Sequence, residues 1–205
     1  MFDTWDKGIK NEFSRTEKQA LIHPSGFDEI QYFNSGKYDS LQVINKCNLK
    51  KEDLILEYGC GDGRIMRHLN DNYNIYGVDI VEDFILHSHK LNLKTSLLEN
   101  NKINNFDKIY SLTVFIHLNK SNSKNALQYI YDNLKDGGLA YLQILVYGFD
   151  HDANEYIALN YWKKETLEKM VKSIGFKINH IEEMKGNINE GKFADNHNNF
   201  CIFEK

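Results

Sequence analysis

The chain has 205 residues, of which 41% are hydrophobic and 13% aromatic, and it carries a formal net charge of -4 at pH 7. This length suits one well-packed domain, and the acidic balance argues against a protein that grips a long nucleic acid, which usually needs a basic surface. The three cysteines, Cys47, Cys60 and Cys201, form no C-x-x-C pair, so we expect a reducing compartment and no metal site. No apolar run approaches membrane-spanning length and no signal pattern opens the chain, so we expect a cytoplasmic protein without a membrane partner.

Residues 1–50 precede the predicted sheet, and we expect them to form a helical cap. Short helices are predicted over Arg15–His23, where a proline follows, over Asp28–Gly36, which the glycine closes, and over Tyr38–Cys47. The segment Ser35–Asp39 is then predicted to be a turn between the second and third of these helices.

The pattern that follows the cap predicts a strand, a glycine turn and a helix. Leu54–Leu56 is a short apolar run typical of a buried parallel strand. Three glycines then come at alternate positions: Gly59, Gly61 and Gly63. Glycine lets the backbone approach a ligand and adopt a positive φ. The amphipathic pattern after them places Arg64, Arg67 and His68 on the polar side of a helix.

The spacing of the glycines discriminates between two classes of nucleotide site. A dinucleotide-binding turn has the pattern G-x-G-x-x-G, and here Arg64 stands where the third glycine belongs. This argues against a bound pyrophosphate and so against a nicotinamide-dependent oxidoreductase. The next predicted strand, Asn74–Asp79, ends in an acid, and a carboxylate in that position can accept both hydroxyls of a ribose.

The remaining pattern alternates predicted helices and strands to the end of the chain. Helices are expected over Val81–Leu91, Asn122–Leu134 and Glu165–Ile174. Strands are expected over Thr95–Glu99, Lys108–Thr113, Leu139–Val146, a segment beginning at Gly175–Ile178, and Phe200–Phe203, with a turn at Asp136–Gly138.

Two motifs together carry a resemblance to a known family. The stretch Ile55–Arg64 (ILEYGCGDGR), followed at this distance by Tyr76–Ile80 (YGVDI), resembles the class I S-adenosylmethionine-dependent methyltransferases. The resemblance covers roughly residues 50–205. It implies an α/β fold, a Rossmann-like three-layer sandwich whose seven-stranded, mostly parallel sheet has an antiparallel last strand, with the helical N-terminal cap beside it. We expect a single domain, in which residues 1–50 are the cap or lid and residues 51–205 bind the cofactor.

The resemblance also implies the cofactor, S-adenosyl-L-methionine, with S-adenosyl-L-homocysteine as product, and a set of residues around it. Glu57 is expected to hold the ammonium, Asp79 the ribose hydroxyls, and Ser111 and Leu112 to line the sulfonium. Lys37 is either a partner of the cofactor's carboxylate or an ordinary solvated lysine. The full set of expected cofactor-binding residues is Lys37, Glu57, Gly59, Cys60, Gly61, Asp79, Ile80, Glu99, Asn100, Ser111 and Leu112; one of Glu99, Asn100 and Asn101 is expected to bond the adenine.

Methyl transfer from a sulfonium is an in-line displacement that mainly needs alignment and exclusion of water. A general base is needed only where the acceptor arrives protonated. The candidates for a catalytic role follow the fourth and fifth strands: His117, the best single base candidate, Tyr147 and His151. Each has a plain structural alternative, as a packing or solvated residue.

These observations predict a methyltransferase that acts on an oxygen or nitrogen of a small soluble acceptor, as a monomer or homodimer. The alternatives are an RNA or protein methyltransferase and a non-catalytic relative that still binds S-adenosylmethionine. Nucleic acid is disfavoured because the end of the fourth strand, Ser111–Val114, lacks the Asn/Asp-Pro-Pro-aromatic tetrad of base-methylating enzymes.

Overall fold

The computed structural model describes residues 14–153, 158–184 and 200–205, and within them seven strands form one sheet in the order β3-β2-β1-β4-β5-β7-β6. The pairs among β1 to β5 are parallel, whereas β7 runs antiparallel to both β5 and β6. The predicted mostly parallel sheet with an antiparallel last strand is therefore confirmed. The strands are β1 (Leu54–Tyr58), β2 (Asn74–Asp79), β3 (Thr95–Leu97), β4 (Phe106–Ser111), β5 (Leu134–Gln143), β6 (Lys177–Ile181) and β7 (Phe200–Glu204).

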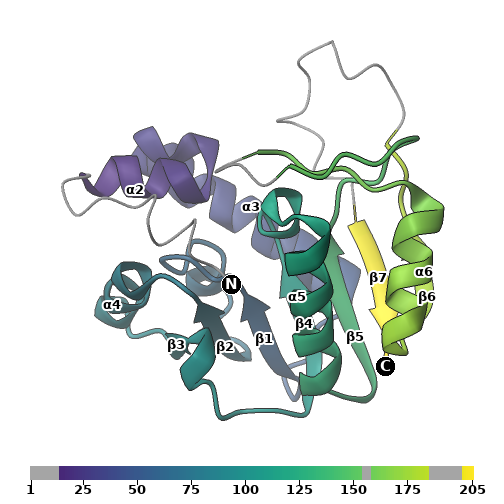
Figure 1. Cartoon of the computed structure of the whole chain (residues 1–205). Coiled ribbons are helices and arrows are strands. Elements are labelled where there is room, and N and C mark those ends of the chain that lie inside the picture. Colours follow the sequence, from purple (N-terminus) through teal and green to yellow (C-terminus); the bar gives the residue numbers. More distant parts are fainter. Residues whose placement is uncertain (1–13, 154–157, 185–199) are drawn as a thin grey trace.

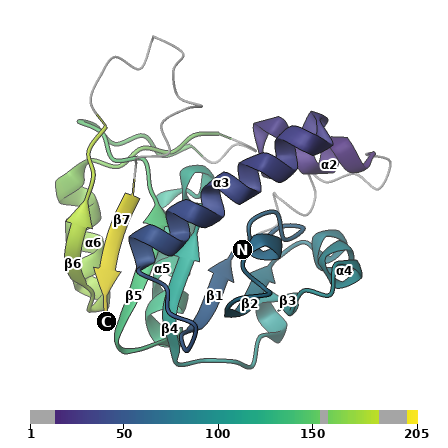
Figure 2. The same ribbon diagram turned by 180° about the vertical axis from the view of Figure 1, so that it is seen from behind.

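Helices lie on both faces of the sheet and complete the predicted three layers. Figure 1 shows α5 and α6 in front of the strands with α4 beside the β2–β3 edge, and Figure 2 shows α3 crossing the opposite face diagonally. Among the described residues, no helix combines the length and the apolar character that crossing a membrane requires. The α-helices are α2 (Arg15–Ile22), α3 (Glu29–Cys47), α4 (Glu82–Lys90), α5 (Lys120–Asn133) and α6 (Lys164–Ile174), with 3₁₀ helices at Pro24–Phe27, Met66–His68, Leu98–Asn100 and Phe115–His117.

Strand β1 lies at the centre of the sheet and is apolar on both sides. Ile55 points into the hydrophobic cluster that α3 covers, whereas Leu56 points into the cluster beneath α5 and α6, and both side chains are fully buried. A strand covered by helices on both faces requires an uninterrupted apolar run, which is why the sequence pattern identified it.

Helix α3 is continuous, so the predicted turn at Ser35–Asp39 is wrong. Gly36 does not close a helix: a Cβ at this position would lie 2.2 Å from the backbone oxygen of Arg64. Because glycine has no Cβ, α3 can approach the backbone of Arg64 closely at Gly36. Lys37 consequently lies on an exposed part of a helix and not in a turn. Residues 1–13 of the predicted cap lie outside the described residues.

The segment after the glycines also differs from its prediction. It forms turns and the short 3₁₀ helix Met66–His68 in place of an amphipathic helix, and Arg64, expected on the polar side, is only 2% exposed. Strand β4 starts and ends earlier than expected, and Thr113 beyond its end has a φ of 61°. The predicted turn around Gly137, where φ is 74°, lies within β5.

Candidate functional site

A cleft opens at the carboxyl ends of β1, β2 and β4, where ligands of open parallel sheets bind. The empty space within it is about 680 Å³, including the part open to solvent. Leu21 and Ile22 of α2 and Phe84 of α4 contribute apolar walls. Asp79 is the one charged side chain among the described residues that line it. The lining is therefore mostly apolar, and Asp79 offers its carboxylate to a polar group of a ligand.

The glycine turn forms the floor of this cleft. Gly59, Gly61 and Gly63 have φ values of 76°, 53° and 86°, a backbone region that side chains disfavour. The amides of Gly59 and Cys60 both donate to the Val78 oxygen, at 2.8 and 3.0 Å, and so tie the turn to β2. The turn is held in place by strand β2 as well as by its own glycines.

Asp79 joins the cleft to the same turn. Its Oδ2 accepts a hydrogen bond from the Gly61 amide at 2.8 Å, and its Oδ1 accepts one from the Val81 amide at 3.0 Å. Burial raises the pKa of Asp79, against the opposing effect of these amide donors. The carboxylate lines the cleft and also orders the two segments beside it.

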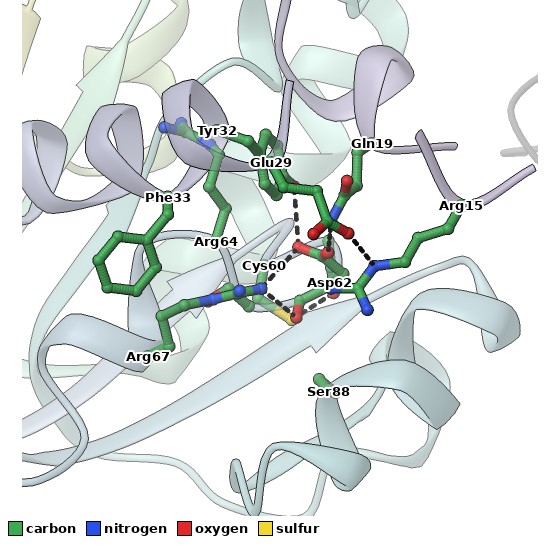
Figure 3. Close-up of polar contacts among 12 residues, drawn as sticks. Arg15, Gln19, Glu29, Tyr32, Phe33, Cys60, Asp62, Arg64, Arg67 and Ser88 are labelled. Atoms are coloured by element: carbon green, nitrogen blue, oxygen red, sulfur yellow. Dashed lines mark hydrogen bonds and ion pairs between the residues drawn. The ribbon is translucent and has the colours of Figure 1, made fainter. Parts of the chain in front are cut away.

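Asp62 connects the glycine turn to the two N-terminal helices. The Tyr32 hydroxyl of α3 donates to Oδ1 at 2.8 Å, and the Gln19 amide of α2 lies 3.4 Å from Oδ2. Arg67 approaches Oδ1 at 3.4 Å from the opposite side (Figure 3). Burial and the nearby carboxylate of Asp62 raise the pKa of Tyr32, so its hydroxyl remains a donor.

A buried ion pair makes the second connection between α3 and the turn. Arg64 Nη1 lies 2.7 Å from Asp39 Oδ2, with the two side chains 2% and 5% exposed, and it also donates to Ser35 Oγ at 3.2 Å. Such a pair is costly to break, because either partner alone would leave an uncompensated buried charge.

Glu57, at the end of β1, is a buried carboxylate of a different kind. Its side chain is enclosed, and Oε2 has no hydrogen-bond partner among the described residues. Burial raises the pKa of Glu57 to about 8, although the Tyr110 hydroxyl and Arg64 oppose the shift. A donor or a positive charge brought close to this oxygen would be favoured.

The structure brings only part of the predicted cofactor set to the cleft. Gly59, Gly61, Asp79 and Ile80 line it. Four others, Glu57, Cys60, Ser111 and Leu112, are buried next to it without lining it, and Ser111 Oγ donates to the Tyr58 oxygen at 2.7 Å. The remaining three are exposed and do not line it: Lys37, Glu99 and Asn100.

The three predicted catalytic residues lie on the segments that follow β4 and β5. His117 Nδ1 is 3.2 Å from the Ala158 oxygen, so its ring faces the backbone of Ala158. The Tyr147 ring packs edge-on against Phe149, and the backbones of His151 and Tyr161 form an isolated antiparallel β-bridge. None of the three predicted residues lines the cleft, and their catalytic role remains a prediction.

Several residues of the site went unnoticed in the sequence. Leu21 and Ile22 resemble ordinary helix-face residues, and Thr113 and Val114 resemble the end of a strand. Asp62 carried a usable signal: an acid inside the glycine turn. Its partners Gln19 and Tyr32, however, lie 43 and 30 positions away in the chain.

Comparison with known proteins identifies the family. A sequence profile described as a methyltransferase domain matches residues 31–181, more than half of the chain. The chain is also 23% identical over 184 residues to the phosphoethanolamine N-methyltransferase of Plasmodium falciparum (isolate 3D7), covering 80% of this chain and 67% of the relative.

Solved structures share the fold. An S-adenosylmethionine-dependent methyltransferase from Clostridium acetobutylicum ATCC 824 superposes with a TM-score of 0.57 at 16% identity, covering 98% of this chain and 95% of that one. The [4+2]-cyclase SpnF superposes with a TM-score of 0.57 at 18% identity, covering 71% of this chain but only 59% of the cyclase. Because a cyclase shares it, the fold alone does not specify the reaction.

Proposed function

Because the chain belongs to the methyltransferase domain family, we propose that it transfers a methyl group from S-adenosylmethionine to an oxygen or nitrogen of a small soluble acceptor. The observation that carries this proposal is the cleft at the strand ends, where the glycine turn and Asp79 meet beneath apolar walls. The proposal includes a cytoplasmic enzyme, monomeric or homodimeric, in which residues 1–50 act as a cap. The position of Leu21 and Ile22 in the cleft wall supports the proposal that residues 1–50 act as a cap.

S-adenosylmethionine, the methyl donor that this family implies, matches the chemistry of the residues present. The apolar walls near Phe84 suit the adenine, and Asp79 is the acceptor for the ribose hydroxyls. Glu57 offers an unpartnered buried carboxylate oxygen, which the cofactor's ammonium group would compensate. We assign these roles to Asp79 and Glu57 as part of the proposal.

The remaining task of the protein is to align the acceptor with the methyl group and to exclude water. His117 is the proposed base for an acceptor that arrives protonated. Two features support it: the next residue, Leu118, lines the cleft, and His117 belongs to the 3₁₀ helix that begins four residues after the end of β4. Tyr147 and His151 are proposed to contact the acceptor from the 147–162 segment.

A small acceptor with a nitrogen nucleophile is favoured by the curated relative, whose name specifies phosphoethanolamine and N-methylation. RNA or a protein as acceptor, and a non-catalytic relative, are the alternatives. The net charge of -4 argues against RNA. A screen of small amines and hydroxyl compounds with methyl-labelled S-adenosylmethionine tests the proposal directly, and transfer only to RNA or protein would contradict it.

Binding and turnover separate the enzyme from a non-catalytic relative. S-adenosylhomocysteine should raise the melting temperature, whereas NAD should not. The His117→Gln variant should lose most of its turnover while its affinity for S-adenosylhomocysteine stays unchanged, and the exposed His180→Gln variant is the matched control. Equal turnover in both variants would remove His117 from the chemistry.

A further inference from the structure

Thr113 has an unusual backbone conformation at the edge of the cleft. Its φ is 61°, and the other three described non-glycine residues with positive φ are Asn48, Asn92 and Asn105. Asparagine tolerates this left-handed region, whereas a β-branched residue in it is a genuine outlier. Such strain persists only where the surroundings impose it, and it concentrates at functional sites.

One side chain is hydrogen-bonded to the Thr113 backbone. Gln143, the last residue of β5, accepts a hydrogen bond from the Thr113 amide through Oε1 at 2.8 Å. The Thr113 hydroxyl is already used, because Oγ1 donates to the Leu112 oxygen at 2.7 Å. The bond to Gln143 therefore reaches the strained turn from outside, from a residue thirty positions further along the chain.

The turn that Gln143 holds is part of the cleft. Thr113 and Val114 both line it, and Val114 Cγ2 lies only 2.3 Å from the position that a Cβ on Gly59 would occupy. The 3₁₀ helix Phe115–His117 starts at the next residue. A change in the Thr113 backbone would move Val114 away from the glycine turn and shift the start of that helix.

We propose that Gln143 is a positioning residue for the cofactor cleft: its side-chain oxygen holds Thr113 in the left-handed conformation and thereby seats Val114 against Gly59. Gln143 does not line the cleft itself. The inference depends on the cofactor cleft of this family and not on the identity of the acceptor.

Two variants of Gln143 test whether the acceptor oxygen matters. Gln143→Met keeps the length of the side chain but removes the acceptor, and we expect it to bind S-adenosylhomocysteine about 2- to 10-fold more weakly in calorimetry, as the loss of one hydrogen bond suggests. Gln143→Glu retains an oxygen acceptor and should bind within about twofold of the wild type. The exposed Gln128→Met variant is the matched control.

Rescue at Thr113 separates positioning from a general loss of packing. Asparagine and glycine adopt a positive φ without external help. In the Gln143→Met background, Thr113→Asn or Thr113→Gly should therefore restore affinity to near the wild-type value, because the turn no longer needs the bond. Loss of packing around Gln143 would not be repaired by a change at Thr113.

Two results would overturn the proposal: wild-type affinity in a folded Gln143→Met variant, or failure of both Thr113 substitutions to restore it. A wild-type chain that binds no S-adenosylhomocysteine would overturn it together with the cofactor assignment. A wild-type chain that binds this product but methylates no small acceptor would contradict only the proposed function.

Discussion

The two walls of the cleft are held by different kinds of interaction. The wall built on the glycine turn is anchored by buried charged side chains. Asp62 contacts Tyr32, Gln19 and Arg67. Asp39 forms an ion pair with Arg64. The wall that follows β4 is joined by backbone hydrogen bonds to the segment after β5, which does not line the cleft itself: Asn160 donates to Ile116 at 2.7 Å, and within that segment Tyr147 donates to Trp162 at 2.8 Å.

The two kinds of interaction differ in how well they tolerate substitutions. Backbone hydrogen bonds survive most side-chain substitutions, so a segment held by them can change its residues while it keeps its course. A buried charge depends on one specific partner, so the glycine-turn wall should tolerate far fewer changes. The expected effects of substitutions on the two walls follow this order.

The largest effect is expected where the buried ion pair is broken. Asp39→Ala leaves the Arg64 guanidinium buried without its carboxylate, and we expect it to cost roughly 3–5 kcal/mol of unfolding free energy in urea titration. The control is Glu168→Ala, which removes an exposed pair with Lys172 and should cost less than about 0.5 kcal/mol. Similar losses in the two variants would refute the importance of burial.

The next effect is a dependence on pH at Glu57. Its pKa is raised to about 8 from an ordinary value of 4.5, so between these values the folded state holds a proton that the unfolded state has released. Stability in the absence of ligand should therefore fall as the pH rises from about 5 to about 8, by less than about 1.4 kcal/mol per pH unit.

Glu57→Gln isolates this contribution because other titrating groups cancel in the comparison with the wild type. The variant should gain stability relative to the wild type as the pH rises from 5 to 8 in parallel urea titrations. A difference between the two proteins that does not change with pH would show that Glu57 titrates normally.

A smaller effect is expected where the two walls touch. Gly59→Ala combines a positive φ with a Cβ placed against Val114, and it should cost roughly 1–3 kcal/mol. Two other glycines separate the causes. Gly137→Ala has the positive φ but no neighbour within 4 Å, whereas Gly148→Ala has neither feature and should be close to neutral. The melting temperature should fall most in Gly59→Ala, less in Gly137→Ala and least in Gly148→Ala. Any other order would contradict the explanation.

The smallest effect is expected in the segment after β5. Asn160 is 2% exposed, and its Oδ1 accepts from the Ala153 amide at 2.6 Å, while Nδ2 has no partner among the described residues. Asn160→Ala should cost about 1 kcal/mol in urea titration, because one accepted bond is lost and one unsatisfied donor disappears. A loss as large as that of Asp39→Ala would contradict the proposed difference between the walls.

Most of the sheet was predictable because its signals are local. The apolar run of β1, the glycines after it and the acid that ends β2 each reflect the conformation or burial of the residues themselves. Gly36 misled the prediction because glycine has two uses: it can end a helix, or it can permit close approach within one. Only the position of Arg64 against α3 decides between them.

Local sequence patterns were enough to predict the layered sheet, the glycine turn at its carboxyl edge and the methyltransferase resemblance, because the burial of a strand and the conformational freedom of a glycine depend on neighbouring residues. Which charges are buried and which contacts hold the cleft walls became known only from the folded structure. Arg64 with Asp39, Asp62 with Gln19, and Thr113 with Gln143 are separated by 25 to 43 positions. No local pattern encodes such pairs, because their energies arise only when the folded chain removes both partners from water.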